Sequence, residues 1–140
     1  TRRRRQRQMC IRDSVKTGVV NWIKNLNSNV TPIITGNLIF TISNDGYLYV
    51  VEKNKGNILR ITDLFNNYKT KKRKDIQPVG FVIGNTNLYL TNSDGKIIIA
   101  DLSDGKVLNI EKVSGDIVSE PFTFNNNLYV VRNNSIVQYN

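Results

Sequence analysis

The chain has 140 residues, of which 39% are hydrophobic, so it is long enough for one domain with a packed core. It contains no His and a single Cys, which excludes a zinc cluster, a Cys/His nucleophile pair, a Ser-His-Asp triad and a disulfide framework. No apolar run approaches the ~18 residues of a transmembrane helix. The composition indicates a binding or scaffolding module, or a fragment whose chemistry lies elsewhere.

The net charge of +9 is concentrated in two short stretches. Residues 1–14 hold six Arg and one Asp, and residues 66–75 hold four Lys, one Arg and one Asp. The rest of the chain has as many acidic as basic residues. A nucleic-acid backbone is bound by positive charge spread over a face, so we expect no nucleic-acid partner.

Residues 1–14 differ in character from the rest of the chain. Residues 8–14 (QMCIRDS) match one translation frame of a transposase-adapter end, and residues 1–7 are low-complexity Arg and Gln. We interpret residues 1–14 as a sequencing-adapter artefact, expect them to be disordered, and expect the genuine sequence to begin near Val15 inside a longer parent. The alternative is a real basic arm that binds an acidic partner.

The remaining sequence predicts short β-strands, because its β-branched and aromatic runs are too short for helices and are separated by Gly, Asn and Asp. In chain order, we expect strands at 19–23, then 31–35, 38–43, 47–52 and 58–62, then 79–83, 88–92, 96–101 and 107–111, and finally 121–124, 128–132 and 136–139. A basic loop, residues 66–75, interrupts the series.

These strands belong to a repeat. Gly18, Gly56 and Gly105 open similar motifs at spacings of 38 and 49 residues, and the basic loop explains the longer spacing. A period near 40 residues with four strands per unit is typical of a β-propeller. The repeat units are residues 15–29, 30–65, 76–112 and 117–140. We therefore predict an all-β fold: a β-propeller fragment of four-stranded antiparallel blades, two complete and two partial.

Hairpin turns are predicted within each unit. Asp45-Gly46 and Asp94-Gly95 lie between two β-runs, a pattern that favours type I′ turns with positive φ at both positions. In the last unit Asn133-Asn134 replaces this pair, and Asn also tolerates the left-handed region. We interpret these aspartates as turn residues rather than as metal or acid/base carboxylates.

The glycine motif resembles the pyrroloquinoline-quinone-like propeller repeat, with Trp22 four residues after Gly18 and Asp101 four before Gly105. About the last 80 residues are also similar to the C-terminal part of the propeller lipoprotein family of the outer-membrane β-barrel assembly machinery. The residues that carry this similarity are Ser93-Asp94-Gly95, the Gly105 motif, Ser119-Glu120-Pro121 and the final Ile136-Val137-Gln138-Tyr139.

This resemblance implies a non-catalytic protein-binding scaffold that has no cofactor, lies in the periplasm at the outer membrane, and has the barrel-forming assembly subunit as its partner. One alternative is the C-terminal fragment of a quinone-dependent dehydrogenase whose catalytic blades lie upstream. Another is a generic ligand-binding propeller. The sequence identifies no catalytic, cofactor-binding or metal-binding residue.

Two sets of candidate residues follow. The basic loop is the candidate partner-binding segment, because loops presented by a rigid scaffold often carry function, and the alternative interpretation is a solvated, mobile loop. Its candidate residues are Tyr68, Lys69, Lys71, Lys72, Arg73 and Lys74. The structural repeat residues are Gly18, Trp22, Asp45, Gly46, Gly56, Asp94, Gly95, Asp101 and Gly105. We expect Trp22 to pack between blades rather than to embrace a quinone.

Overall fold

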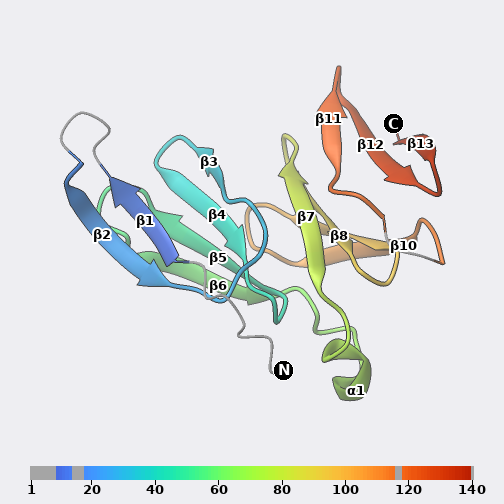
Figure 1. Ribbon diagram of the computed structural model, residues 1–140, viewed down its shortest axis with the longest axis horizontal. Coiled ribbons are helices and arrows are strands. Elements are labelled where there is room, and N and C mark those ends of the chain that lie inside the picture. Colours follow the sequence, from blue (N-terminus) through green and yellow to red (C-terminus); the bar gives the residue numbers. More distant parts are fainter. Residues whose placement is uncertain (1–8, 14–17, 116–117, 140) are drawn as a thin grey trace.

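The computed structural model describes residues 9–13, 18–115 and 118–139. In this part of the chain the strands form four antiparallel sheets, and each sheet follows the order of the sequence (Figure 1). The first blade contains β3 (Ile33–Thr35), β4 (Leu38–Ile42), β5 (Tyr47–Glu52) and β6 (Ile58–Asp63). The second blade contains β7 (Pro78–Ile83), β8 (Asn87–Asn92), β9 (Lys96–Asp101) and β10 (Val107–Lys112).

Two smaller sheets flank these blades. The third blade contains β11 (Phe122–Phe124), β12 (Asn127–Arg132) and β13 (Ser135–Tyr139), and the N-terminal sheet contains β1 (Met9–Asp13) and β2 (Val20–Asn25). Every strand expected between residues 19 and 139 is present, with bounds that differ by at most two residues. The all-β propeller class, with four-stranded blades, is therefore confirmed.

The N-terminal segment differs from expectation. Met9–Asp13 form β1, which pairs antiparallel with β2, so the expectation of disorder is wrong for these five residues. An edge strand leaves a row of backbone N–H and C=O groups without partners, and β1 supplies partners to one edge of β2. Residues 1–8 and 14 lie outside the described residues, and the origin of residues 1–14 stays a prediction.

The blades pack face to face through the central strands. Period-two alternation sends Ile98 and Ala100 of β9 into the core between the first and second blades, and sends Ile97 into the core shared with the third blade. Ile98 and Ala100 are fully buried, and Ile97 is nearly so. The central strands are therefore apolar on both faces, which explains their nearly continuous hydrophobic sequence.

Two of the three predicted turns have a different backbone geometry from the one expected. Gly46 and Gly95 have positive φ (86° and 76°), but the aspartates before them do not, so the type I′ assignment is wrong at both Asp-Gly pairs. Asn133 and Asn134 do have positive φ at both positions (44° and 60°). A single left-handed Gly after a turn is the geometry of a turn with a bulge, which needs only one permissive residue.

The basic loop contains the one helical turn of the described residues, α1 (Thr70–Arg73), where the sequence predicted only a loop. This turn projects below the sheets in Figure 1, at the end of the molecule where the first blade connects to the second. The described part of the chain has no helix with the length and apolar character needed to span a bilayer.

Candidate functional site

The repeat motif residues join one blade to the next. Trp22 of β2 lies against Gly56 in the turn between β5 and β6, where a Cβ atom would come within 2.6 Å of the indole ring. The indole Nε1 donates a hydrogen bond of 2.8 Å to the carbonyl oxygen of Lys53. Trp22 is thus placed between the N-terminal sheet and the first blade.

Arg60 makes the equivalent connection one blade later. It stands four residues after Gly56, where the motif around Gly18 has Trp22. Its guanidinium donates to the carbonyl oxygens of Leu102, at 3.0 Å, and Ser103. Leu102 precedes Gly105 by three residues, as Lys53 precedes Gly56. The Arg60 guanidinium therefore binds a carbonyl in the turn between β9 and β10 that corresponds to the carbonyl bound by the Trp22 indole in the turn between β5 and β6.

The motif carboxylates stabilise their own turns. Asp101 accepts hydrogen bonds from the hydroxyl of Ser103 and, at 2.7 Å, from its backbone N–H, and these bonds lower the pKa of Asp101. Asp104 accepts the N–H of Lys106 at 2.8 Å, and Asp94 accepts the N–H of Lys96 at 3.3 Å. An aspartate that binds the N–H two residues later is a common turn stabiliser.

Arg73 anchors one end of the basic loop. Its guanidinium binds the carboxylate of Asp63 through two hydrogen bonds of 2.6 Å and donates a third, of 3.3 Å, to the carbonyl oxygen of Asp45. It also lies 5.1 Å above the centre of the Tyr47 ring. The hydrogen bonds to Asp63 raise the pKa of Arg73 above its usual value. A bidentate pair of this kind fixes geometry as well as charge.

Tyr68 anchors the other end. Its hydroxyl donates to the carboxylate of Asp94 at 3.2 Å, and its ring meets Phe65 edge-on at 5.4 Å. Burial, together with the nearby Asp94 charge, raises the pKa of Tyr68 to about 12. Phe65 is fully buried and covers Gly46, where a Cβ atom would overlap its ring. The Asp-Gly turns of two successive blades therefore hold the loop.

The four lysines of the loop have no such role. Lys69, Lys71, Lys72 and Lys74 are exposed, and no carboxylate among the described residues lies within ion-pair distance of any of them. The structure thus divides the six candidate residues into two anchors and four solvent-facing cations. Sequence reasoning missed Asp63, although a carboxylate at the end of a strand just before a basic insertion was an available signal.

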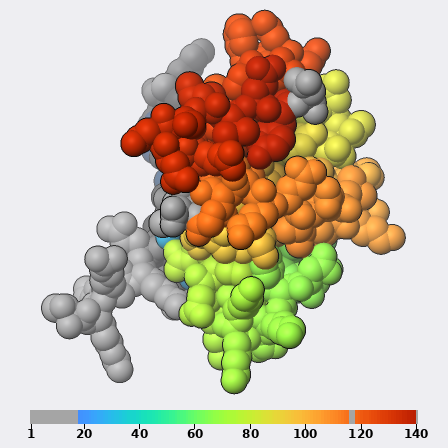
Figure 2. Space-filling view, turned by 90° about the vertical axis from the view of Figure 1, so that its right-hand side faces the viewer, coloured from blue at the N-terminus to red at the C-terminus, as the bar shows by residue number. Residues whose placement is uncertain are grey.

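A shallow hollow of about 500 Å³ brings some of these cations together with residues of the second blade. It is lined by Asn67, Tyr68, Lys69, Lys72, Lys96, Ile110 and Lys112. Figure 2 shows the loop, in yellow-green, next to the orange segment that contains β10. Lys96 and Lys112 could not be identified from the sequence, because nothing in the linear order places them beside the loop.

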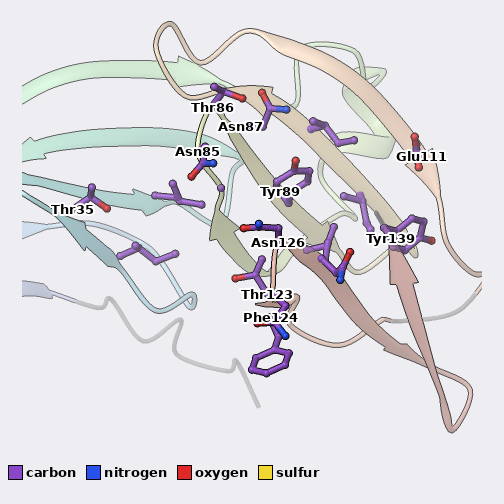
Figure 3. A pocket seen from close by; sticks show the side chains of 18 residues that line it. Thr35, Asn85, Thr86, Asn87, Tyr89, Glu111, Thr123, Phe124, Asn126 and Tyr139 are labelled. Carbon is purple, nitrogen blue, oxygen red and sulfur yellow. The ribbon is translucent and has the colours of Figure 1, made fainter.

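A larger, open hollow of about 800 Å³ is lined mainly by the second and third blades, with Ile33 and Thr35 from β3 of the first blade. Figure 3 shows Asn85 and Thr86 from the β7–β8 turn and Asn87 at the start of β8 on one side, with Glu111 and Tyr139 farther along. Phe124, which is 65% exposed, points away from the other labelled side chains. No group of three or more potential metal-ligating side chains occurs among the described residues.

No model of a protein family matches the sequence, and no curated protein matches it. Solved structures do show similarity. BamB from Moraxella catarrhalis superposes with a TM-score of 0.66 at 19% identity, over 94% of this chain and 39% of that one. Sqt1 from Saccharomyces cerevisiae gives 0.74 at 16% identity, also over 94% of this chain and 39% of that one.

A third similar structure is the quinohemoprotein alcohol dehydrogenase from Comamonas testosteroni, with a TM-score of 0.56 and 15% identity over 74% of this chain and 17% of that one. At these identities the similarity concerns the fold. The chain is a β-propeller fragment that spans about two fifths of the length of BamB and Sqt1.

Proposed function

We propose that this chain is part of a non-enzymatic, protein-binding scaffold of the bacterial envelope that takes part in outer-membrane β-barrel assembly. The observation that carries the proposal is the structural similarity to BamB over 94% of the chain. It agrees with the sequence resemblance of the last 80 residues to the assembly-machinery propeller. The parent protein is then periplasmic and associated with the outer membrane, and its partner is the barrel-forming subunit.

The geometry of the basic loop supports a binding role. Arg73 and Tyr68 fix the loop on the rim of two blades, so its lysines are presented by a rigid platform. Loops positioned in this way are common binding elements, and clustered cations accelerate encounter with an acidic partner.

The test is co-isolation of the tagged full-length parent protein with the barrel-forming subunit from solubilised outer membranes. We expect the subunit to be recovered in near-stoichiometric amount, and recovered far less with an unrelated tagged periplasmic protein. Fractionation should place the parent in the periplasmic and outer-membrane fractions. Recovery of the parent in the cytoplasm, or without the subunit, would contradict the proposal.

The dehydrogenase alternative has the similarity to the quinohemoprotein alcohol dehydrogenase in its favour. The described residues hold no group of three or more Asp, Glu, His or Cys side chains that could bind a metal ion. Addition of pyrroloquinoline quinone and Ca²⁺ to the full-length protein separates the two functions. Tight quinone binding with dye-linked alcohol oxidation would overturn the scaffold proposal.

A further inference from the structure

The 500 Å³ hollow combines side chains from two separate elements. Tyr68, Lys69 and Lys72 come from the basic loop, whereas Ile110 and Lys112 come from β10 of the second blade. Residues two apart in a strand face the same side, so Ile110 and Lys112 both point toward the loop. Because Tyr68 and Arg73 hold the loop against this face, the hollow is a fixed part of the rim.

The hollow carries a strong excess of positive charge. Four lysines line it, namely Lys69, Lys72, Lys96 and Lys112. The one carboxylate that reaches them among the described residues is Asp94, which lies 3.9 Å from Lys96 and also accepts the hydroxyl of Tyr68. Glu111, the one carboxylate of β10, faces the opposite side of the sheet and lines the larger hollow instead.

Two of these lysines are direct neighbours across the sheet. Lys112 of β10 pairs in register with Lys96 of β9. Like charges directly opposite each other in an antiparallel pair are destabilising. Lys96 is partly compensated by Asp94 and by the Tyr68 ring, whose centre lies 5.5 Å from its ammonium group. Lys112 has no carboxylate within ion-pair distance among the described residues, so an anion bound here would relieve the repulsion.

The floor of the hollow is apolar. The half-buried ring of Tyr68 and the half-buried side chain of Ile110 line the hollow together with the lysines. The cations that line the hollow are all ammonium groups. The nearby guanidinium of Arg73 is paired with Asp63. Ammonium groups bind carboxylates and phosphates alike as point charges, whereas the apolar surface of Tyr68 and Ile110 favours a peptide segment in which carboxylates flank an apolar side chain.

We propose that this hollow binds an acidic segment of a protein partner, with its carboxylates at Lys69, Lys72 and Lys112 and an apolar side chain against Tyr68 and Ile110. The inference rests on the proposed scaffold function, because it specifies the chemistry of a protein partner. Its test uses a synthetic peptide, so its outcome is independent of whether the barrel-forming subunit is that partner.

The experiment measures fluorescence anisotropy of a short labelled peptide made of Glu with two Leu residues, titrated with the full chain at fixed ionic strength. The variant Lys69→Glu/Lys112→Glu should weaken binding roughly tenfold or more, since it replaces attraction by repulsion at both sides of the hollow. A matched charge control, Lys55→Glu/Lys106→Glu, alters exposed lysines in turns that do not line the hollow and should change affinity less than about threefold. Thermal melts followed by circular dichroism establish that both variants are folded.

Three further arms decide the outcome. The variant Lys71→Glu/Lys74→Glu alters loop lysines outside the hollow, and an equal loss there would show general charge attraction and overturn the proposal. Lys112→Gln removes one charge without a reversal and should still weaken binding severalfold. A peptide with Ser in place of Leu should bind more weakly, and unchanged affinity would overturn the apolar contact.

Membrane binding is tested separately with vesicles containing phosphatidylglycerol. If the vesicles bind the chain and the Glu/Leu peptide does not, the hollow recognises anionic lipid and the proposal is wrong. Absence of peptide binding to the unaltered chain overturns it as well. Peptide binding without co-isolation of the barrel-forming subunit would instead reject the outer-membrane role and leave the acidic-segment site in place.

Discussion

The indole of Trp22 lies against the backbone of Gly56, one sheet further along the chain, and donates its N–H to the carbonyl of Lys53. Arg60 reaches the corresponding carbonyl of Leu102 in the next blade. The repeat therefore keeps a side-chain donor to the next turn while the donor itself changes from indole to guanidinium. Blade docking in this chain depends on a position and a hydrogen bond more than on one residue type.

Gly56→Ala should destabilise the chain through two separable effects. Gly56 has φ +73°, which strains any L-residue, and its added Cβ would also overlap the indole of Trp22. Gly36→Ala is the matched control, because Gly36 has φ +58° and open space where the Cβ would lie. We expect a loss of about 1 kcal/mol for the control and about 2–4 kcal/mol for Gly56→Ala in urea unfolding. Equal losses would show that the indole contact contributes nothing.

Arg60→Met should weaken the docking of the first blade on the second. The variant keeps an unbranched, apolar stem but loses the hydrogen bonds to the carbonyls of Leu102 and Ser103. Hydrogen bonds from a charged donor contribute about 1.5–3 kcal/mol each when buried, and this half-exposed pair should contribute about 1–2 kcal/mol in total. The urea midpoint measures the effect. Arg60→Lys should recover less than half of it, and full recovery would mean that charge alone matters.

Arg73→Gln should release the basic loop without unfolding the blades. The substitution removes both hydrogen bonds to Asp63 and the contact above Tyr47, so local opening of residues 69–75 becomes less costly. We expect amide hydrogen exchange in this segment to accelerate roughly five- to tenfold, with the strands unchanged. Lys71→Gln is the control, since it removes an exposed charge from the same helical turn. Equal acceleration in both variants would contradict the anchoring role.

Much of the fold could be predicted because its determinants are local. Alternating apolar runs and Asp-Gly or Asn-Asn pairs set the strand bounds, and the 38-residue glycine spacing set the blade period. The Asp-Gly turn type was wrong because the pair is compatible with two geometries: a type I′ turn, or a turn with a bulge that needs positive φ at Gly alone. That choice depends on how the strands pair.

The site was less predictable because its contacts are long-range. The sequence marks residues 66–75 as basic, but it does not show that Arg73 returns to Asp63 or that Tyr68 reaches Asp94 of the next blade. Lys112 lies more than thirty residues beyond the loop in the sequence and meets it only after the second blade has formed. Charge counts identify such a loop, whereas blade packing decides which cations converge.

Tyr68→Phe should reveal the anchor through the pH dependence of stability. The pKa of Tyr68 is raised from 10.0 to about 12 in the folded chain, so folding favours the protonated hydroxyl. The stabilisation that the protonated Tyr68 hydroxyl gives to the folded chain is fully present below about pH 10 and is lost as the pH rises through about 12. Near pH 8 the variant should be less stable by about 1 kcal/mol, because the hydrogen bond to Asp94 is absent. Urea unfolding at about pH 8 and about pH 11 should show this gap narrowing at the higher pH. Tyr129→Phe controls for loss of a tyrosine hydroxyl elsewhere, and a gap that stays constant between the two pH values would mean that the Tyr68 proton has no part in holding the loop.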